Sequence, residues 1–307
     1  MQNLDTVQKI KRVRVFQHVD WLKRAVKLIV ITCCHFHVLH AEVISVYDIG
    51  TGSVKVHVLQ HDIEGVRNLF FKRTKTFYPG HIVFLDDKII KPEDIDIILS
   101  AIKELQQSSL SFTPNHSFAV ATELFRQAKN GQDVIRYLQD MTGIEITIIS
   151  QEQEGVFGFL GACLEGNFDP ETAVVWDIGS GSFQITCLHN SEYVVYKAAI
   201  GLHAAFQIIA EGRQNEFIKA LMDVPDVVRN KIADKDSIVI GIGAHPVLKI
   251  GKTTYCLQDI KEALMRDDLS ANSHLMFVQA VFEQLAIRQV NYHYGPSSIT
   301  TGALLCK

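Results

Sequence analysis

The stretch YDIGTGSVKV, residues 47–56, recurs almost letter for letter as WDIGSGSFQI, residues 176–185. The six-residue cores, DIGTGS and DIGSGS, differ only in Thr51 against Ser180. An apolar run typical of a buried strand precedes each core, and a second apolar run follows it. Each stretch therefore predicts a β-hairpin with a glycine turn, and the recurrence predicts two domains related by duplication.

The length and composition suit two domains of ordinary size. The chain has 307 residues, 47% of them apolar and 21% charged, which is enough to bury a core in each domain. A net charge of -4 provides no basic face of the kind that binds nucleic acid, so we expect no nucleic-acid partner. The six cysteines show neither a CxxC pair nor metal-ligand spacing, which argues against a zinc site or a disulfide framework.

Residues 1–41 form an N-terminal extension with two interpretations. Lys23, Arg24 and Lys27 precede a short apolar run, and residues 38–41 resemble a small-residue cleavage site. If residues 23–41 act as a signal peptide, the protein is periplasmic or exported; otherwise it is cytoplasmic, with an amphipathic helix or a mispredicted start codon at this end. The apolar run is too short for a stable membrane span.

A first domain is expected over residues 42–166. A proline at position 92 opens a predicted helix with an apolar stripe, and Asn130 is the expected N-cap of a helix over 132–141. The segment Ser150 to Gln153 reads as a capping box, so another helix should begin at Gln151. Strands are predicted at residues 43–49, 54–60, 70–78, 117–121 and 144–149.

A second domain is expected over residues 167–307, after a turn-rich break at 167–170. It repeats the opening hairpin and then carries a third glycine turn at residues 241–243. Strands are predicted at 173–176, 183–189 and 238–241, and helices at 203–220 and 226–232.

The repeated turn has a chemistry of its own. Glycines two apart let backbone N–H groups approach an anion without an intervening Cβ, which suits a phosphate. The aspartate before each turn ends a buried strand, where a carboxylate is costly unless it binds a metal such as Mg²⁺. One such turn is readily explained by hairpin geometry alone. Two copies in equivalent contexts favour a site in which both turns grip one anionic chain.

Several motifs together resemble a known family. The two turns resemble those of the actin, Hsp70 and sugar kinase superfamily. The segments ATELFRQAKN (residues 121–130), GIEI (143–146) and SQEQEG (150–155) resemble the exopolyphosphatase/guanosine pentaphosphate phosphatase family, specifically from about Val43 to Leu188. The resemblance implies an α/β fold of two duplicated actin-like (ribonuclease H-like) domains, with mixed sheets flanked by helices and the active site in the interdomain cleft.

The resemblance also implies roles for individual residues. Glu154 corresponds to the general base that activates water, and Asp48 and Asp177 correspond to residues that hold Mg²⁺, directly or through water. Position 154 lies in the first turn of the capped helix, where the helix favours anions. The implied phosphate-binding residues are Gly50, Ser53, Lys55, Arg126, Gly179, Gly181 and Ser182.

Each of these residues has a purely structural alternative. Glu154 is also explained as an ordinary first-turn carboxylate of a helix. Arg126 is also explained as a surface cation paired with Glu123 or Asp133, and Lys55 as a solvent-facing strand residue. The serines of the two turns, at positions 53 and 182, are also explained as side chains that only tie their own turns together.

The chain departs from the family pattern at three places. Val156 follows the acidic motif where an arginine is usual. The third turn continues as Ala244 and His245 where the family has glycine and threonine, which weakens the case for nucleotide binding. The C-terminal stretch, residues 294–305, resembles the family's closing helix but lacks the basic residue that usually precedes its glycine. No extra C-terminal domain follows it in this sequence, so we do not expect a processive enzyme for long polyphosphate chains.

Three functions follow from these observations. The first is an enzyme, a Mg²⁺-dependent phosphoanhydride hydrolase that acts on inorganic polyphosphate or guanosine pentaphosphate, with the altered third turn favouring polyphosphate. The second is a catalytically weak protein that senses polyphosphate or an alarmone. The third is an ATP-using kinase or ATPase of the same superfamily, which would need a working nucleotide loop at residues 241–246. The resemblance also makes a homodimer one expected state.

Overall fold

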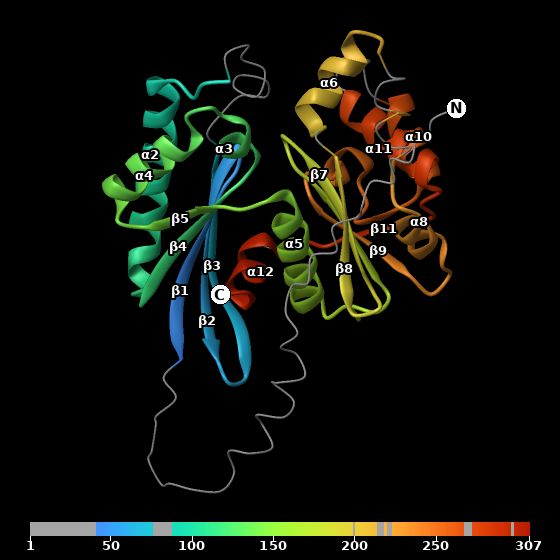
Figure 1. The fold of residues 1–307 in the computed structure, drawn as a ribbon. Coiled ribbons are helices and arrows are strands. Elements are labelled where there is room, and N and C mark those ends of the chain that lie inside the picture. Colours follow the sequence, from blue (N-terminus) through green and yellow to red (C-terminus); the bar gives the residue numbers. More distant parts are fainter. Residues whose placement is uncertain are drawn as a thin grey trace, which may run out of the picture.

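Two mixed β-sheets form the framework of the computed structural model (Figure 1). The structure describes residues 41–75, 88–198, 200–213, 218–219, 223–266, 272–295 and 298–307. The predicted extension therefore lies outside the described residues, except for its last residue. No helix of the described part is long and apolar enough to cross a membrane.

The first sheet has five strands in the order β3-β2-β1-β4-β5. The predicted hairpin is confirmed, because β1 and β2 pair antiparallel across the first glycine turn. The third strand pairs antiparallel with β2, whereas β4 runs parallel to β1 and β5 parallel to β4. The bounds are β1 (Glu42–Ile49), β2 (Ser53–Asp62), β3 (Gly65–Lys75), β4 (His116–Ala121) and β5 (Glu145–Ile148).

The second sheet repeats this arrangement. Its order is β10-β11-β9-β6-β7-β8, in which β6, β7 and β8 pair antiparallel while β9 and β11 run parallel to β6. Five of its strands therefore match the first sheet in order and direction, as a duplication predicts, and β10 adds an edge. The bounds are β6 (Ala173–Ile178), β7 (Phe183–His189), β8 (Glu192–Ala198), β9 (Ile238–Gly243), β10 (Thr254–Tyr255) and β11 (Val290–Tyr292).

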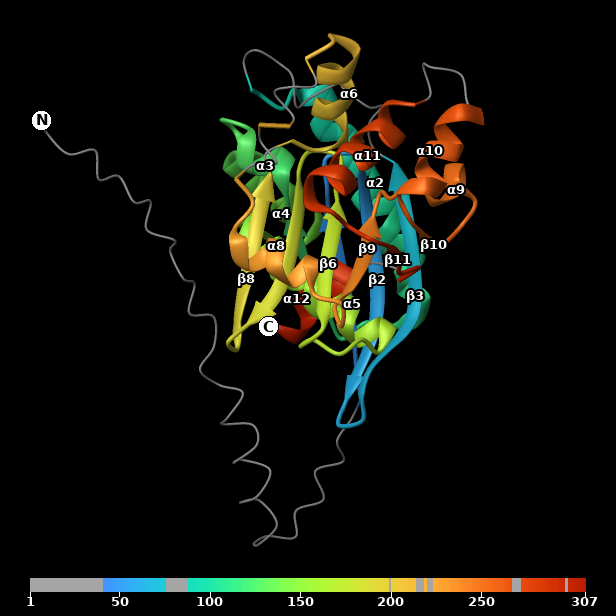
Figure 2. The same cartoon turned by 90° about the vertical axis from the view of Figure 1, so that its right-hand side faces the viewer.

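Helices cover the outer face of each sheet (Figures 1 and 2). In α2 (Pro92–Ser109), the predicted stripe lies against the first sheet, with Ile98 and Ile102 buried, and α4 (Gly131–Thr142) packs beside it. The second sheet is covered by α6 (Leu202–Ala210), α8 (Asp226–Ala233), α10 (Leu257–Arg266) and α11 (Ser273–Leu285). Three shorter helices are η1 (Leu110–Phe112), α3 (Glu123–Gln127) and α9 (Val247–Ile250).

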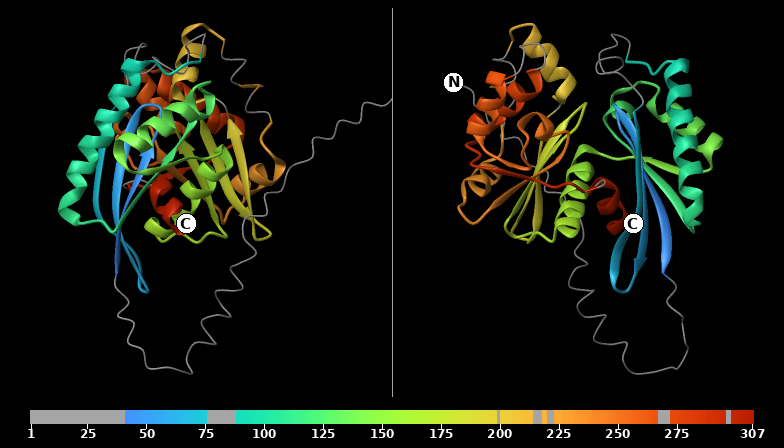
Figure 3. Two further views of the ribbon diagram at one scale, coloured as in Figure 1. Left: turned by 60° about the vertical axis from the view of Figure 1, so that its left-hand side comes forward. Right: turned by 180° about the vertical axis from the view of Figure 1, so that it is seen from behind.

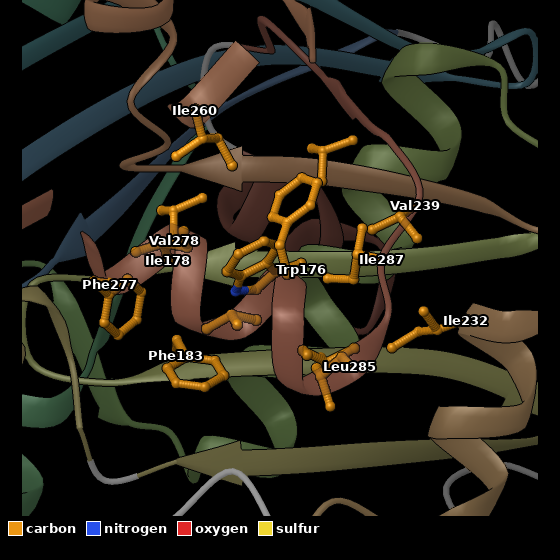
Figure 4. Close-up of a cluster of buried hydrophobic side chains, with 14 of the residues drawn as sticks. Trp176, Ile178, Phe183, Ile232, Val239, Ile260, Phe277, Val278, Leu285 and Ile287 are labelled. Carbon is orange, nitrogen blue, oxygen red and sulfur yellow. The ribbon is translucent and has the colours of Figure 1, made fainter. Parts of the chain in front are cut away.

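The largest buried side chain of the second core is Trp176 (Figure 4). It belongs to β6 and lies among residues of β7 and α11, including Phe183, Phe277 and Leu285. Every second residue of β6 points into this core, so the residues between them face the other side of the sheet.

Two helices, α5 (Gln151–Gly166) and α12 (Ser298–Leu305), lie between the sheets (Figures 1 and 3). The first packs on the inner face of the second sheet through Phe159 and Ala162. The other packs on the inner face of the first sheet through Ile299 and Ala303. The two helices also contact one another, because Gly161 lies directly on the backbone of Ser298.

Three local expectations need correction. Asn130 precedes α4, but its side chain does not cap that helix: it accepts from Ile90 N and donates to Ile90 O, at 2.9 and 2.8 Å. The helix expected over 203–220 ends at Ala210, where a turn with Gly212 at φ +71° follows. The third glycine turn begins later than expected, since residues 241–243 belong to β9. The last three residues of the strand expected at 70–78 lie outside the described part.

The remaining expected elements are present with shifts of at most a few residues at their ends. The capping box is confirmed, since Ser150 Oγ accepts from Gln153 N at 3.1 Å and the Gln153 side chain accepts from Ser150 N at 2.8 Å. The fold class of mixed sheets flanked by helices is therefore confirmed. The division of the chain between residues 166 and 167 stays a prediction.

Candidate active site

The alternation of β1 and β6 directs two aspartates between the sheets. In β1, Tyr47 and Ile49 point into the outer core, and in β6 Trp176 does the same. Asp48 and Asp177 therefore lie on the opposite, inner faces, where both are buried. The sequence predicted this convergence of the two carboxylates.

The two glycine turns contact one another. Each is closed by an equivalent hydrogen bond, from Gly50 N to Ser53 O at 3.0 Å and from Gly179 N to Ser182 O at 2.9 Å. Between the turns, a Cβ on Gly52 would lie 2.9 Å from the Ser180 hydroxyl. None of the turn glycines has a positive φ, so close approach rather than backbone conformation explains Gly52, Gly179 and Gly181, whereas a Cβ on Gly50 would make only ordinary contacts.

The backbone amides available to a phosphate do not include those of Gly50 and Gly179, which the sequence named as phosphate-binding residues. The N–H groups of Gly50 and Gly179 close their own turns. By contrast, the N–H groups of the next two residues in each turn (Thr51, Gly52, Ser180 and Gly181) donate to no described residue. No donated bond within the described part therefore occupies these four amides, which leaves them available to an anion. The side chain of Ser182 accepts a hydrogen bond from Gln184 of β7 at 3.2 Å.

The two halves differ in charge at one equivalent position. In β2, Lys55 lies opposite Asp48, and its Nζ is 2.6 Å from Asp48 Oδ2. In β7 the residue opposite Asp177 is Gln184, a neutral side chain. Lys55 thus belongs to the site and is not a solvent-facing residue. Asp48 thus forms an ion pair with Lys55, whereas no described cation forms an ion pair with Asp177.

Asp177 has the properties of a carboxylate in need of a cation. Burial raises its pKa to about 6; Lys55 acts to lower that pKa and Asp48 to raise it further. No described residue donates a hydrogen bond to its oxygens. The described residues include no cluster of three His, Cys, Asp or Glu side chains able to hold a metal. Mg²⁺ commonly takes one or two carboxylates, with water and substrate phosphates as its other ligands, so Asp177 with Asp48 fits Mg²⁺.

Glu154 lies in the same site, in the first turn of α5. It is 7% exposed, and its Oε2 accepts from Arg126 Nη2 at 2.7 Å. Burial raises its pKa to about 7; Arg126 acts to lower this pKa, and Asp177 and Asp48 act to raise it. No described donor reaches Oε1, so that oxygen is open to water.

Arg126 is held by more groups than the sequence indicated. It extends from α3 and contacts two buried carboxylates, those of Glu123 and Glu154, and the carbonyl of Ile149. The alternative partner, Asp133, pairs with Arg136 instead. Arg126 therefore connects α3 to the candidate base on α5.

In the third turn, Ala244 and His245 stand where the family has glycine and threonine, and neither the Ala244 amide nor the His245 ring offers a free hydrogen-bond donor to a phosphate. Ala244 N donates to Ile178 O at 2.8 Å. His245 is buried: Nε2 donates to Trp176 O at 3.0 Å, and Nδ1 accepts from Tyr255 Oη at 2.5 Å. Burial lowers the pKa of His245 to about 3, which keeps it neutral. The residue is a core histidine and not a phosphate ligand.

Sequence reasoning missed several residues that shape the site. Gly201 donates to Gly181 O at 3.1 Å, and a Cβ on it would overlap the backbone of the second turn. Gln151 donates to Phe183 O and Ala198 O, which fixes the start of α5 on β7 and β8. Neither has a local sequence signal, because both contacts join segments that are distant in the chain.

Comparison with known families bears on this site directly. Residues 72–204 match the model of the Ppx/GppA phosphatase family. The resemblance noted in the sequence is thereby confirmed. The expectation of an enzyme is confirmed with it, because the matched family is one of phosphatases. The matched segment includes Arg126, Glu154 and the second glycine turn, whereas the first turn precedes it.

Solved structures of Ppx/GppA proteins share the fold. A family member from Aquifex aeolicus is 16% identical, with a TM-score of 0.64 over 87% of this chain and 97% of that chain. An exopolyphosphatase from Cytophaga hutchinsonii is also 16% identical, with a TM-score of 0.69 over 86% of this chain and 97% of that chain. These structures confirm the predicted two-domain, actin-like fold. No curated protein matches the chain in sequence.

Proposed function

We propose that the protein hydrolyses the terminal phosphoanhydride bond of inorganic polyphosphate, with Glu154 as the general base and Mg²⁺ as the cofactor. One observation carries the proposal. Glu154 is a buried carboxylate whose pKa is raised to about 7. Its Oε2 is held by Arg126, whereas Oε1 is open. The charges of Asp177 and Asp48 contribute to the raised pKa, so the three carboxylates interact. A base with a pKa near the working pH is efficient in proton transfer.

The proposed reaction uses the two carboxylate oxygens differently. Oε2 of Glu154 stays on Arg126, and Oε1 takes a proton from water as the water oxygen forms its bond to the terminal phosphorus. The bridging P–O bond breaks, and the departing chain keeps the electron pair. The open amides of the two glycine turns donate to the non-bridging oxygens, as preorganised donors do where charge develops. Mg²⁺ held by Asp177 and Asp48 would neutralise phosphate charge.

The third turn favours polyphosphate over guanosine pentaphosphate as the substrate. In the wider superfamily that the sequence resembles, the third turn packs against a nucleoside or a distal phosphate, so an altered third turn weakens the case for a nucleotide. Here Ala244 N and both ring nitrogens of His245 are already bonded within the protein. Recognition of a phosphate chain needs only the two turns and the cations.

The direct test is phosphate release from inorganic polyphosphate, guanosine pentaphosphate and ATP, each with and without Mg²⁺. We expect Mg²⁺-dependent release, fastest from polyphosphate. Faster release from guanosine pentaphosphate would contradict the substrate assignment alone, and equal release with a chelator present would contradict the cofactor. Absence of release from every substrate would contradict the hydrolase.

A second function, a catalytically weak sensor of polyphosphate or an alarmone, is favoured by one observation. The two cations named here for the site, Lys55 and Arg126, are both in ion pairs with carboxylates, and Val156 stands where an arginine is usual. Binding of polyphosphate without release of phosphate would identify the sensor. A kinase or ATPase is less supported, because it depends on the third turn.

The pH dependence of the reaction follows from Glu154. The base acts only when deprotonated, and its pKa is about 7 compared with an ordinary value of 4.5. We therefore expect kcat/KM for polyphosphate to rise with pH, to reach half its maximum near pH 7 and then to level off, because kcat/KM reports groups of the free enzyme. Steady-state rates across a buffer series provide the measurement. A half-maximum near pH 4.5 would mean that the base is a carboxylate with an unshifted pKa.

A further inference from the structure

Glu123 is a buried carboxylate to which neither the sequence nor the family match assigns a role in the reaction. It is the first residue of α3 and is 6% exposed. Its Cγ packs on the second glycine turn, so closely that a Cβ on Gly181 would lie 2.8 Å from it. Glu123 therefore extends from the first sheet's side of the site to a turn of the second sheet. Burying a charged group in this way is costly unless its partners are fixed.

The partners of Glu123 are fixed on both oxygens. Oε2 accepts from Arg126 twice, from Nε at 3.0 Å and from Nη2 at 2.7 Å. Oε1 accepts from the exposed side chain of Gln127 at 2.8 Å. The guanidinium is planar and rigid, so two donors on one oxygen set the direction of its remaining N–H groups.

The remaining N–H groups of Arg126 reach the candidate base. One proton of Nη2 is directed to Oε2 of Glu154, at 2.7 Å, and Nη1 donates to Ile149 O at 2.9 Å. Four of the five N–H groups of Arg126 are thus engaged within the protein. In this arrangement the guanidinium orients a carboxylate, and one N–H group, on Nη1, is left for another acceptor.

We propose that Glu123 is a positioning residue for hydrolysis. It fixes Arg126 so that Arg126 holds Oε2 of Glu154 and leaves Oε1 directed at the attacking water. This inference rests on the proposed role of Glu154 as the base. Glu123 itself does not touch the substrate; it acts through Arg126. Because the orientation of a catalytic group contributes strongly to rate, loss of Glu123 should act on kcat and leave substrate binding unchanged.

The first test is Glu123→Gln, which keeps the shape of the side chain and removes its charge. We expect kcat for polyphosphate to fall about tenfold, with KM within about twofold of the wild-type value. Asp133→Asn is the matched control, since it removes the charge from an exposed carboxylate that pairs with Arg136 and not with Arg126, and it should keep the wild-type kcat. A fall in kcat in both variants, or a rise in KM without a fall in kcat, would overturn the proposal.

A double variant separates positioning from general stability. If Glu123 acts through Arg126, Glu123→Gln should have no further effect on kcat in an Arg126→Gln background. Independent losses that multiply in the double variant would show that Glu123 does not act through Arg126. Thermal unfolding of each variant shows whether the protein being assayed is folded.

A structural measurement keeps this inference distinct from the proposed function. Crystal structures of wild type and Glu123→Gln need no substrate. We expect the contact between Arg126 Nη2 and Glu154 Oε2 to be present in wild type and lost in the variant. If it persists unchanged, Glu123 is not a positioning residue, even if the enzyme hydrolyses polyphosphate. If it is lost but wild type releases no phosphate, Glu123 still orients Glu154, and it is the hydrolase that fails.

Discussion

Glu154→Gln should reduce the rate of phosphate release by a factor of about 100 or more, because removal of a general base typically costs that much. The substitution preserves the size of the side chain and removes the atom that accepts the proton. Arg126 keeps one carboxylate partner, Glu123, so the variant should fold. Binding of polyphosphate should remain. The measurement is kcat under saturating polyphosphate, together with a binding curve for the same variant.

Glu152→Gln is the matched control for this experiment. Glu152 lies in the first turn of the same helix, but its side chain is 36% exposed and pairs with Lys197. Both glutamates interact with the same helix terminus, so an effect of the helix alone would appear in both variants. We expect Glu152→Gln to keep the wild-type rate. Comparable losses in the two variants, or retention of most of the rate by Glu154→Gln, would refute Glu154 as the base.

Gly161→Ala should destabilise the protein by about 3 kcal/mol, at the upper end of the usual cost of overpacking. A Cβ at this position overlaps the carbonyl oxygen of Ser298, so α5 and α12 cannot keep their present separation. Backbone atoms cannot rotate away as a flexible side chain does. Gly302→Ala should have a similar effect, since its Cβ overlaps the carbonyl oxygen of Phe157. Urea-induced unfolding provides the measurement.

Gly158→Ala provides the comparison on the same helix. Its Cβ would lie 3.1 Å from Cδ1 of Ile242, a side chain that is able to shift, and at an ordinary contact distance of 3.8 Å from Oδ2 of Asp177. Alanine also favours helix over glycine by about 1 kcal/mol, which offsets part of the cost. We expect Gly158→Ala to change the free energy of unfolding far less than Gly161→Ala. Equal losses at the two positions would mean that loss of glycine, and not the helix contact, is responsible.

The parts of the fold that sequence predicts are those that local patterns determine. The two hairpins follow from apolar runs around a glycine turn, and the start of α5 follows from the reciprocal bonds of Ser150 and Gln153. Alternation along β1 and β6 then places both aspartates on inner faces. These features depend on residues that are close in the chain, so their signals lie within short windows.

The parts that sequence misses depend on contacts between distant segments. Asn130 has the composition of a cap but bonds to Ile90, forty residues earlier in the chain. Position 245 carries a histidine next to a proline, which indicates a loop, yet its ring enters the core and bonds to Trp176 O and Tyr255. The sequence indicates Glu123, three residues away, as a partner of Arg126. The bond from Arg126 to Glu154 forms only because the fold brings α3 and α5 close together, which no local pattern indicates.

Because Lys55 lies opposite Asp48 and the neutral Gln184 lies opposite Asp177, the charge balance of the two halves depends differently on metal ions in solution. The first turn's counter-charge is covalently part of the protein and cannot be removed by a chelator. On the proposed function, the second turn relies on an ion that exchanges with solvent. Because Mg²⁺ is proposed to lie on both Asp177 and Asp48, depleting divalent ions would remove that charge and leave the charge of Lys55 in place, so polyphosphate should still associate with the protein, weakly and without turnover. The two related halves thus differ in their source of positive charge: a lysine of the chain in the first, and an exchangeable metal ion, on the proposed function, in the second.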